Sequence, residues 1–163
     1  MLSDVLSDYL EIYNRYPTNV SLSKEKRKSR HNELMEWAKQ EYQLLPDICE
    51  IKTFMHTNDS LRYEQPFFLK VVVPRVLKDI NNGVIESLIY LFECNGMDSY
   101  KGTITDYINL LCVGTNYKYI DTMYFVDLVL LHEPENHIVL NYKYNELLRR
   151  LDYSARSSLG CFV

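Results

Sequence analysis

Short breaks rich in Asn and Gly divide the second half of the chain into apolar segments of helical length. The breaks lie at residues 81–83, 95–96 and 114–116, and their spacing of about 13–18 residues suits one helix per segment. Between them, apolar residues recur at i, i+3, i+4 and i+7, which is the period of an amphipathic helix. This pattern predicts an all-α fold in which successive helices form stacked antiparallel hairpins, as in HEAT-like bundles.

The same apolar period recurs in the rest of the chain. It predicts helices over residues 2–16, 23–43, 46–57, 84–94, 98–114, 120–132 and 144–151. Ser3 and Ser23 are placed to cap the first two of these helices. On the last one, Leu147, Leu148 and Leu151 are expected to face inward.

Residues 67–80 leave two alternatives open. The β-branched run at residues 71–73 is compatible with a strand, but Pro74 would interrupt a central β-ladder. The apolar spacing through the segment instead fits a helix that kinks or restarts at Pro74. Gly83 then favours a helix end shortly afterwards.

Domain organisation and compartment follow from length and composition. We expect residues 1–153 to form a single helical domain, and residues 154–163, which show no period, to form a loosely ordered C-terminal tail. The chain begins with acids rather than bases, so we expect no secretory signal. Its longest apolar stretch is far shorter than the ~20 residues that span a bilayer. The four cysteines form no CxxC pair, which favours reduced thiols in a soluble, cytoplasmic protein without membrane contact.

Charge is unevenly distributed along the chain, whose formal net charge is −4. Residues 24–30 hold five bases and one acid, a local charge of +4. Residues 84–146 hold nine acids and three lysines, a local charge of −6. Such an acidic field repels phosphates and attracts cationic partners. We therefore expect this half of the chain to face a basic partner.

No motif for catalysis or metal binding is apparent. Residues 132–137 contain two histidines and two glutamates, but Pro134 breaks the helix that an H-E-x-x-H zinc site needs, and the histidines are five positions apart. A small enzyme would require a pocket joining His31, His56 or His132 to carboxylates, and the sequence shows no such convergence. We expect no catalytic residue, no metal and no cofactor, and a binding protein rather than an enzyme.

Tyrosines are concentrated in the acidic half of the chain, where they offer rigid, amphipathic contact area of the kind enriched at protein interfaces. Tyr107 and Tyr124 lie on predicted helix faces and are expected at the edge of the core. Other tyrosines lie beside helix breaks and close to carboxylates. The predicted partner-binding residues are Asp98, Tyr100, Tyr117, Tyr119, Asp121, Glu133 and Glu135.

In its small size, its acidity and this Tyr- and Asp-rich helical surface, the chain resembles the bacterial immunity proteins of contact-dependent inhibition and related polymorphic toxin systems. The resemblance lies in the overall character of the chain and in the type of surface that the seven residues represent. It implies a protein that binds a cognate basic toxin, in particular a nuclease domain, and blocks its active site or a nearby surface. Such an inhibitor needs complementarity and fast electrostatic association rather than a nucleophile.

The basic run at residues 24–30 supports an alternative function. Clustered Lys and Arg side chains can bind a phosphate backbone, so the chain could be a helical regulator associated with nucleic acid. The run has no interleaved aromatic residues for base stacking, and the chain as a whole is acidic. In a helix its charges would point in all directions around the axis, as in a solvated segment. We therefore expect no direct nucleic-acid contact in the leading hypothesis.

The combined substitutions Asp98→Lys and Asp121→Lys are expected to weaken association with a basic partner strongly at low salt, because attractive charge pairs become repulsive. Calorimetric titration at low and high salt measures the effect. An unchanged affinity in the double variant would contradict the electrostatic part of the hypothesis.

Overall fold

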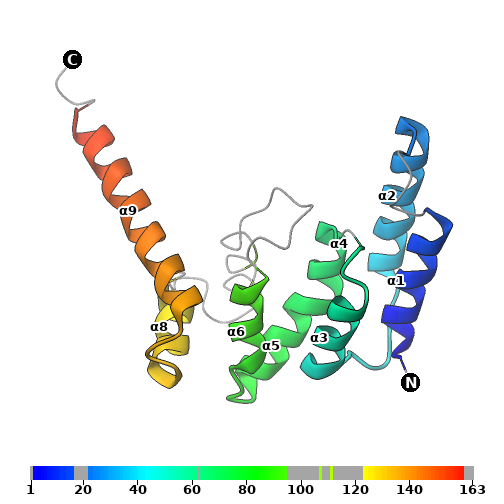
Figure 1. Ribbon diagram of the computed structural model, residues 1–163, viewed down its shortest axis with the longest axis horizontal. Helices are drawn as coiled ribbons and strands as arrows, with labels where there is room; N and C mark the ends of the chain where they lie inside the picture. The colour runs from blue at the N-terminus through cyan, green and yellow to red at the C-terminus, as the bar shows by residue number, and fades with distance from the viewer. Residues whose placement is uncertain are drawn as a thin grey trace. The chain divides into compact units, whose positions relative to one another are not determined.

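A computed structural model describes residues 2–16, 22–61, 63–94, 107, 111 and 123–159. Over these residues the protein is all-α and contains no strand, as the apolar period predicts. The chain divides into two compact units, Met1–Lys118 and Tyr119–Val163, which are described separately. The helices of both units are labelled in Figure 1. The HEAT-like stacking of hairpins and the single domain over residues 1–153 stay predictions.

The first unit begins with two helices, α1 (Asp4–Arg15) and α2 (Lys24–Lys39), which pack side by side and run in opposite directions (Figure 1). Ser23 caps α2 as predicted, since its side chain accepts a hydrogen bond of 3.3 Å from the Lys26 amide. Ser3 precedes α1, but its side chain makes no capping bond. The Ser3 amide instead donates to Glu50 Oε1 at 2.6 Å, which links the start of α1 to α3 (Ile48–Thr57).

An aromatic cluster fills the space between these helices. The Tyr9 ring of α1 lies with its centroid 5.0 Å from that of Trp37 in α2 and 4.7 Å from that of Phe67. Tyr63 stacks on Tyr9, with ring centroids 6.2 Å apart, and lies tilted against Phe67 at 4.9 Å. The Trp37 indole N–H donates to the Val5 carbonyl at 3.2 Å, so its polar atom is satisfied inside the core. Edge and tilted ring contacts of this kind stabilise a core beyond the apolar area they bury.

Residues 65–81 form one continuous helical stretch, which settles the alternative between helix and strand in favour of the helix. The stretch consists of α4 (Gln65–Phe67), the π-turn η1 (Phe68–Val72) and α5 (Val73–Asn81). The predicted irregularity takes the form of a π-turn one turn before Pro74, in which the Val73 amide donates to the Phe68 carbonyl five residues back. Pro74 has no backbone N–H to donate to the carbonyl four residues back, so a regular helix is disfavoured at this point.

The first unit continues through a tight turn into α6 (Glu86–Glu93), whose side chains are almost all buried. Gly83 stands in this turn at a φ of +74°, a conformation that glycine adopts without steric cost. Farther along, Tyr107 is buried and its ring stacks 4.8 Å from Phe68, so it lies inside the core rather than at the predicted edge. The predicted helix over residues 98–114 otherwise lies outside the described residues.

The second unit contains α8 (Met123–His132) and α9 (His137–Leu159), which pack against each other across a four-residue turn. Phe125, Val126 and Val129 of α8 and Val139 of α9 are fully buried. Helix α9 is much longer than the predicted 144–151. Residues 154–159, which the sequence assigned to a loosely ordered tail, belong to it.

The leucines of α9 differ from the prediction. Leu147, Leu148 and Leu151 were expected to face inward, but they are exposed, Leu151 to 66%. The buried face of α9 runs instead through Val139 and Glu146. The prediction failed because an apolar stripe on a helix indicates that one face is apolar, not that a neighbouring element covers it.

Truncation of the aromatic cluster is expected to destabilise the first unit strongly. Phe67→Ala removes a fully buried ring and should lower the free energy of unfolding by about 3–5 kcal/mol, since a cavity replaces four aromatic contacts. Urea denaturation followed by tryptophan fluorescence measures this, because Trp37 lies in the same cluster. Leu44→Ala, at a side chain that is 79% exposed, is the control and should change stability by less than about 0.5 kcal/mol. A loss below about 1 kcal/mol for Phe67→Ala would contradict the assigned core.

Candidate functional site

Five of the seven predicted partner-binding residues lie outside the described residues, so their arrangement stays a prediction. They are Asp98, Tyr100, Tyr117, Tyr119 and Asp121. The other two, Glu133 and Glu135, are exposed in the turn between α8 and α9. The structure therefore brings these two carboxylates to the surface together.

Local hydrogen bonds order this turn. The Glu133 amide donates to the Val129 carbonyl at 2.8 Å, and Asn136 Nδ2 donates to Glu133 Oε2 at 2.8 Å. Asn136 Oδ1 in turn accepts from the Val139 amide at 3.1 Å, as an N-cap of α9 does. No group of three His, Cys, Asp or Glu side chains among the described residues is arranged to hold a metal ion. The turn thus presents two exposed carboxylates, of which that of Glu133 is held by Asn136.

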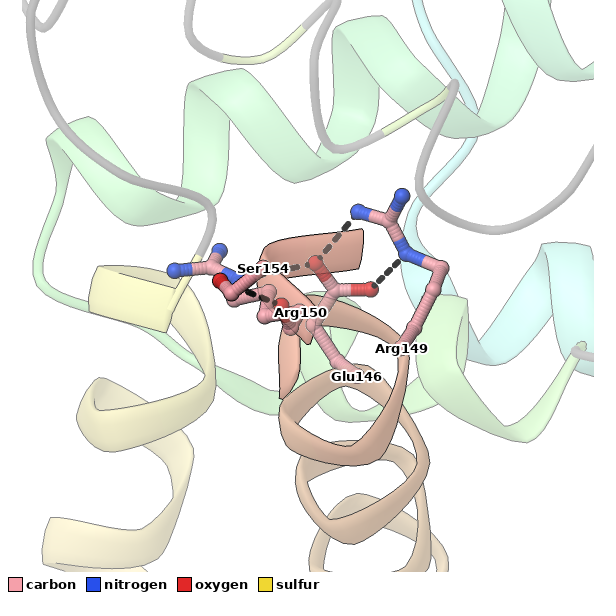
Figure 2. A network of polar contacts seen from close by, with 4 residues as sticks. All are labelled: Glu146, Arg149, Arg150 and Ser154. Carbon is pink, nitrogen blue, oxygen red and sulfur yellow. Dashed lines mark hydrogen bonds and ion pairs between the residues drawn. The ribbon is translucent and has the colours of Figure 1, made fainter. Parts of the chain in front are cut away.

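Glu146, which the sequence analysis counted within the acidic field, is buried and neutralised on α9. Figure 2 shows its carboxylate between two guanidinium groups of the same helix. Arg149 donates from Nε at 2.8 Å and from Nη2 at 2.7 Å, and Arg150 Nε donates at 3.0 Å. These hydrogen bonds hold the pKa of Glu146 below its ordinary value, against the opposing effect of burial. Since the two arginines lie just beyond residue 146, the count of −6 overstates the charge that a partner would meet.

A second acidic surface, which was not predicted from the sequence, lies in the first unit. A groove between α1 and α2 is lined by the charged residues Asp8, Glu11, Arg15, Glu33 and Glu36. Four carboxylates face one guanidinium there, a net charge of −3. We call this surface the acidic groove.

Glu33 is held in place at one end of the acidic groove. Arg15 Nη1 lies 3.1 Å from Glu33 Oε2, and the Tyr16 hydroxyl donates to Glu33 Oε1. The hydrogen bond to this carboxylate raises the pKa of Tyr16, so its hydroxyl stays a donor at neutral pH. The groove therefore contains a carboxylate with a defined orientation rather than a freely rotating one.

Acidic residues continue beyond the groove along α1. A neighbouring hollow shares Asp8 with it and adds Asp4, Glu41 and Tyr42. The Tyr42 hydroxyl donates to Asp8 Oδ2 at 2.7 Å, and burial together with this bond raises the pKa of Tyr42 well above its ordinary value. The two hollows together hold six carboxylates and one guanidinium along one side of the helix pair.

The basic run is not solvated throughout, which corrects the expectation for Arg30. The Arg30 side chain is buried, its Nη2 lies 2.7 Å from Glu64 Oε1, and its guanidinium lies 5.1 Å from the centre of the Tyr13 ring. Lys24, Lys26, Arg27 and Lys28 are exposed. The accessible part of the run is therefore the first two turns of α2.

The acidic groove was missed because it joins residues from two helices on either side of the basic run. A charge count over a continuous window averages the acids of α1 and α2 with the lysines between them. The available signal was the helical spacing of Asp4, Asp8 and Glu11, together with that of Glu33 and Glu36, which places each set on one helix face.

Comparison with known proteins finds no matching family model, no similar curated protein and no similar solved structure. Among the described residues, no helix is both long and apolar enough to cross a membrane.

The Glu146 network is expected to make stability depend on pH. Because the pKa of Glu146 is lowered in the folded protein, its stabilisation is present above the ordinary carboxyl pKa of about 4.3 and is lost as the pH falls through the lower folded value. Glu146→Gln should lower the free energy of unfolding by about 1 kcal/mol at pH 7. The difference from wild type should shrink towards pH 3.

Urea denaturation followed by circular dichroism at both pH values provides the measurement. Glu135→Gln, at an exposed side chain in the preceding turn, is the matched control and should behave as wild type. A Glu146→Gln effect that is equally large at pH 3 would show that packing, rather than the charge, is responsible.

Proposed function

We propose that this protein is an inhibitor that binds a basic partner protein and covers its functional surface, as immunity proteins do with their toxins. The acidic groove between α1 and α2 is the observation that carries this proposal. Arg15 is the one cation among the residues lining the groove, and it is already engaged by Glu33. Among the other carboxylates, Glu36 pairs with Lys39 at 2.7 Å on the exposed face of α2, and Asp8 accepts a hydrogen bond from Tyr42. Both keep acceptor capacity for the Lys and Arg side chains of a partner, since a carboxylate accepts more than one hydrogen bond.

The geometry of the groove favours fast and oriented association. Asp8 and Glu11 come from α1 and Glu36 comes from α2, so a cationic side chain entering the groove meets carboxylates from both sides. Charges lining a concave surface focus the field and speed diffusional encounter with a partner of opposite sign. A nuclease toxin domain suits this surface because its own nucleic-acid-binding face is basic.

A second contact is available at the α8–α9 turn, where Glu133 and Glu135 are exposed. The resemblance to immunity proteins supports this turn and the predicted loop residues as a further part of the binding surface. In this proposal the encounter takes place in the cytoplasm, where an exposed free thiol such as Cys49 stays reduced. Inhibition requires no nucleophile, metal or cofactor, because the partner's chemistry is blocked rather than reversed.

Charge reversal in the groove is expected to abolish capture of the partner. The wild-type protein, immobilised and exposed to native lysate, should retain one stoichiometric basic protein at low salt and release it at high salt. The double variant Glu11→Lys, Glu36→Lys should retain at least roughly tenfold less of the partner protein, because the groove then repels cations. Mass spectrometry of the eluates gives the identity and amount of the captured protein.

The matched control reverses Glu133 and Glu135 instead. Each double variant raises the net charge by the same amount, so a general effect of charge would weaken both equally. A larger loss in the groove variant locates the site on α1 and α2, and a larger loss in the turn variant moves it to the second unit. Capture of an acidic protein, or equal capture by both variants and wild type, would refute the proposal.

A further inference from the structure

The first two turns of α2 form a basic surface that the inhibitor function does not use. Every residue from Ser23 to Ser29 is exposed, and the four cations Lys24, Lys26, Arg27 and Lys28 stand against a single acid, Glu25. In the described part of the chain, none of these four side chains forms an ion pair, whereas Lys39 and Lys52 each pair with a glutamate. Their charge is therefore available to an external anion.

Helix geometry aligns most of this charge on one flank of α2. Lys24, Arg27 and Lys28 are related by steps of three and four residues, and His31 continues the same line. With a rise of about 1.5 Å per residue, the first three cations are spread over about 6 Å of the helix axis. Long Lys and Arg side chains on such a line reach successive phosphates of one backbone. We call these three residues the basic ridge.

Buried contacts fix the direction in which the ridge points. Arg30, Leu34 and Trp37 form the inward face of α2 and are buried. The groove acids Glu33 and Glu36 lie on the flank towards α1, and the ridge lies on the flank beyond Arg30, near Glu64. The carboxylates that face the ridge are Glu25, on its own helix, and Glu64, which is occupied by Arg30. The acidic groove and the basic ridge are thus on different flanks of one helix.

We propose that the basic ridge binds the sugar-phosphate backbone of a nucleic acid duplex without reading its sequence. Single-strand binders combine cations with exposed aromatic rings that stack on bases. The ridge consists of two lysines and one arginine and has no aromatic ring, so its chemistry matches phosphates rather than bases.

The net negative charge of the protein does not prevent this contact. At physiological ionic strength the Debye length is about 8 Å, so exposed charges on distant surfaces are largely screened from one another. A phosphate at the ridge is within a few ångströms of three cations, and the groove carboxylates are on the other flank. The positive end of the α2 dipole adds to the local field in the same sense.

The test is fluorescence anisotropy of labelled mixed-sequence duplexes, one of DNA and one of RNA, titrated with the full-length protein. Binding is expected with a dissociation constant of roughly 10⁻⁵ M at about 50 mM salt. Because three phosphates are contacted, the logarithm of the association constant should fall with the logarithm of the salt concentration with a slope of about −3. Lys24→Ala combined with Arg27→Ala and Lys28→Ala should weaken binding at least tenfold. Alanine preserves the helix, which circular dichroism verifies.

The matched control is Lys39→Ala combined with Lys52→Ala and Lys78→Ala, which removes the same charge from other surfaces and should bind duplexes as wild type does. Equal weakening by the two triple variants would reduce the effect to net charge and overturn the proposal. It would also be overturned by the absence of saturable binding, by preference for a single strand, or by binding to anionic phosphatidylserine vesicles without binding to duplexes. The Glu11→Lys, Glu36→Lys variant keeps the ridge, so the inhibitor proposal and this one fail independently.

Discussion

The first unit is anchored by the ion pair between Arg30 of α2, which is buried, and Glu64 just before α4, which is partly exposed. Removing a guanidinium from water costs several kcal/mol, which an ion pair offsets only with close geometry and further contacts. Here the 2.7 Å contact with Glu64 is supplemented by the Tyr13 ring, and the Tyr13 hydroxyl donates to the same carboxylate at 3.3 Å. Three segments that are distant in sequence meet at this point, and the aromatic cluster packs beside it.

The pair also determines how the surface charge of α2 is distributed. With Arg30, Leu34 and Trp37 turned inward, the rotation of the helix about its axis is set. The glutamates of its second half then complete the groove with α1, while the basic ridge points away from that groove. An acidic and a basic surface on one helix are therefore consequences of a single internal anchor. Neither surface has to be stabilised separately.

The sequence predicted the helices well, because each buries an apolar stripe whose 3.6-residue period is a local property. It failed to predict the surroundings of charged side chains, because these depend on how the helices pack together. Arg30 looks like its exposed neighbours until Glu64, 34 positions away, is placed beside it. The charge of Glu146 is balanced by two arginines just beyond residue 146. The groove acids are neighbours only because α1 packs on α2. The exposed leucines of α9 show the same limit, since a helix pattern cannot identify the element that covers it.

The π-turn at residues 68–72 has a consequence for how this protein can vary in length. One turn there contains an extra residue, so the buried residues before it, such as Phe67, and those after it, such as Val76, both point into the core. Deleting a single residue from the turn would restore a regular helix and leave α5 in its present orientation relative to α4, so that Val76 stays in the core. A deletion elsewhere in the stretch would instead rotate the residues after it by about 100°. The π-turn is therefore the one place along residues 65–81 where relatives of this chain can lose a residue and keep the same buried face.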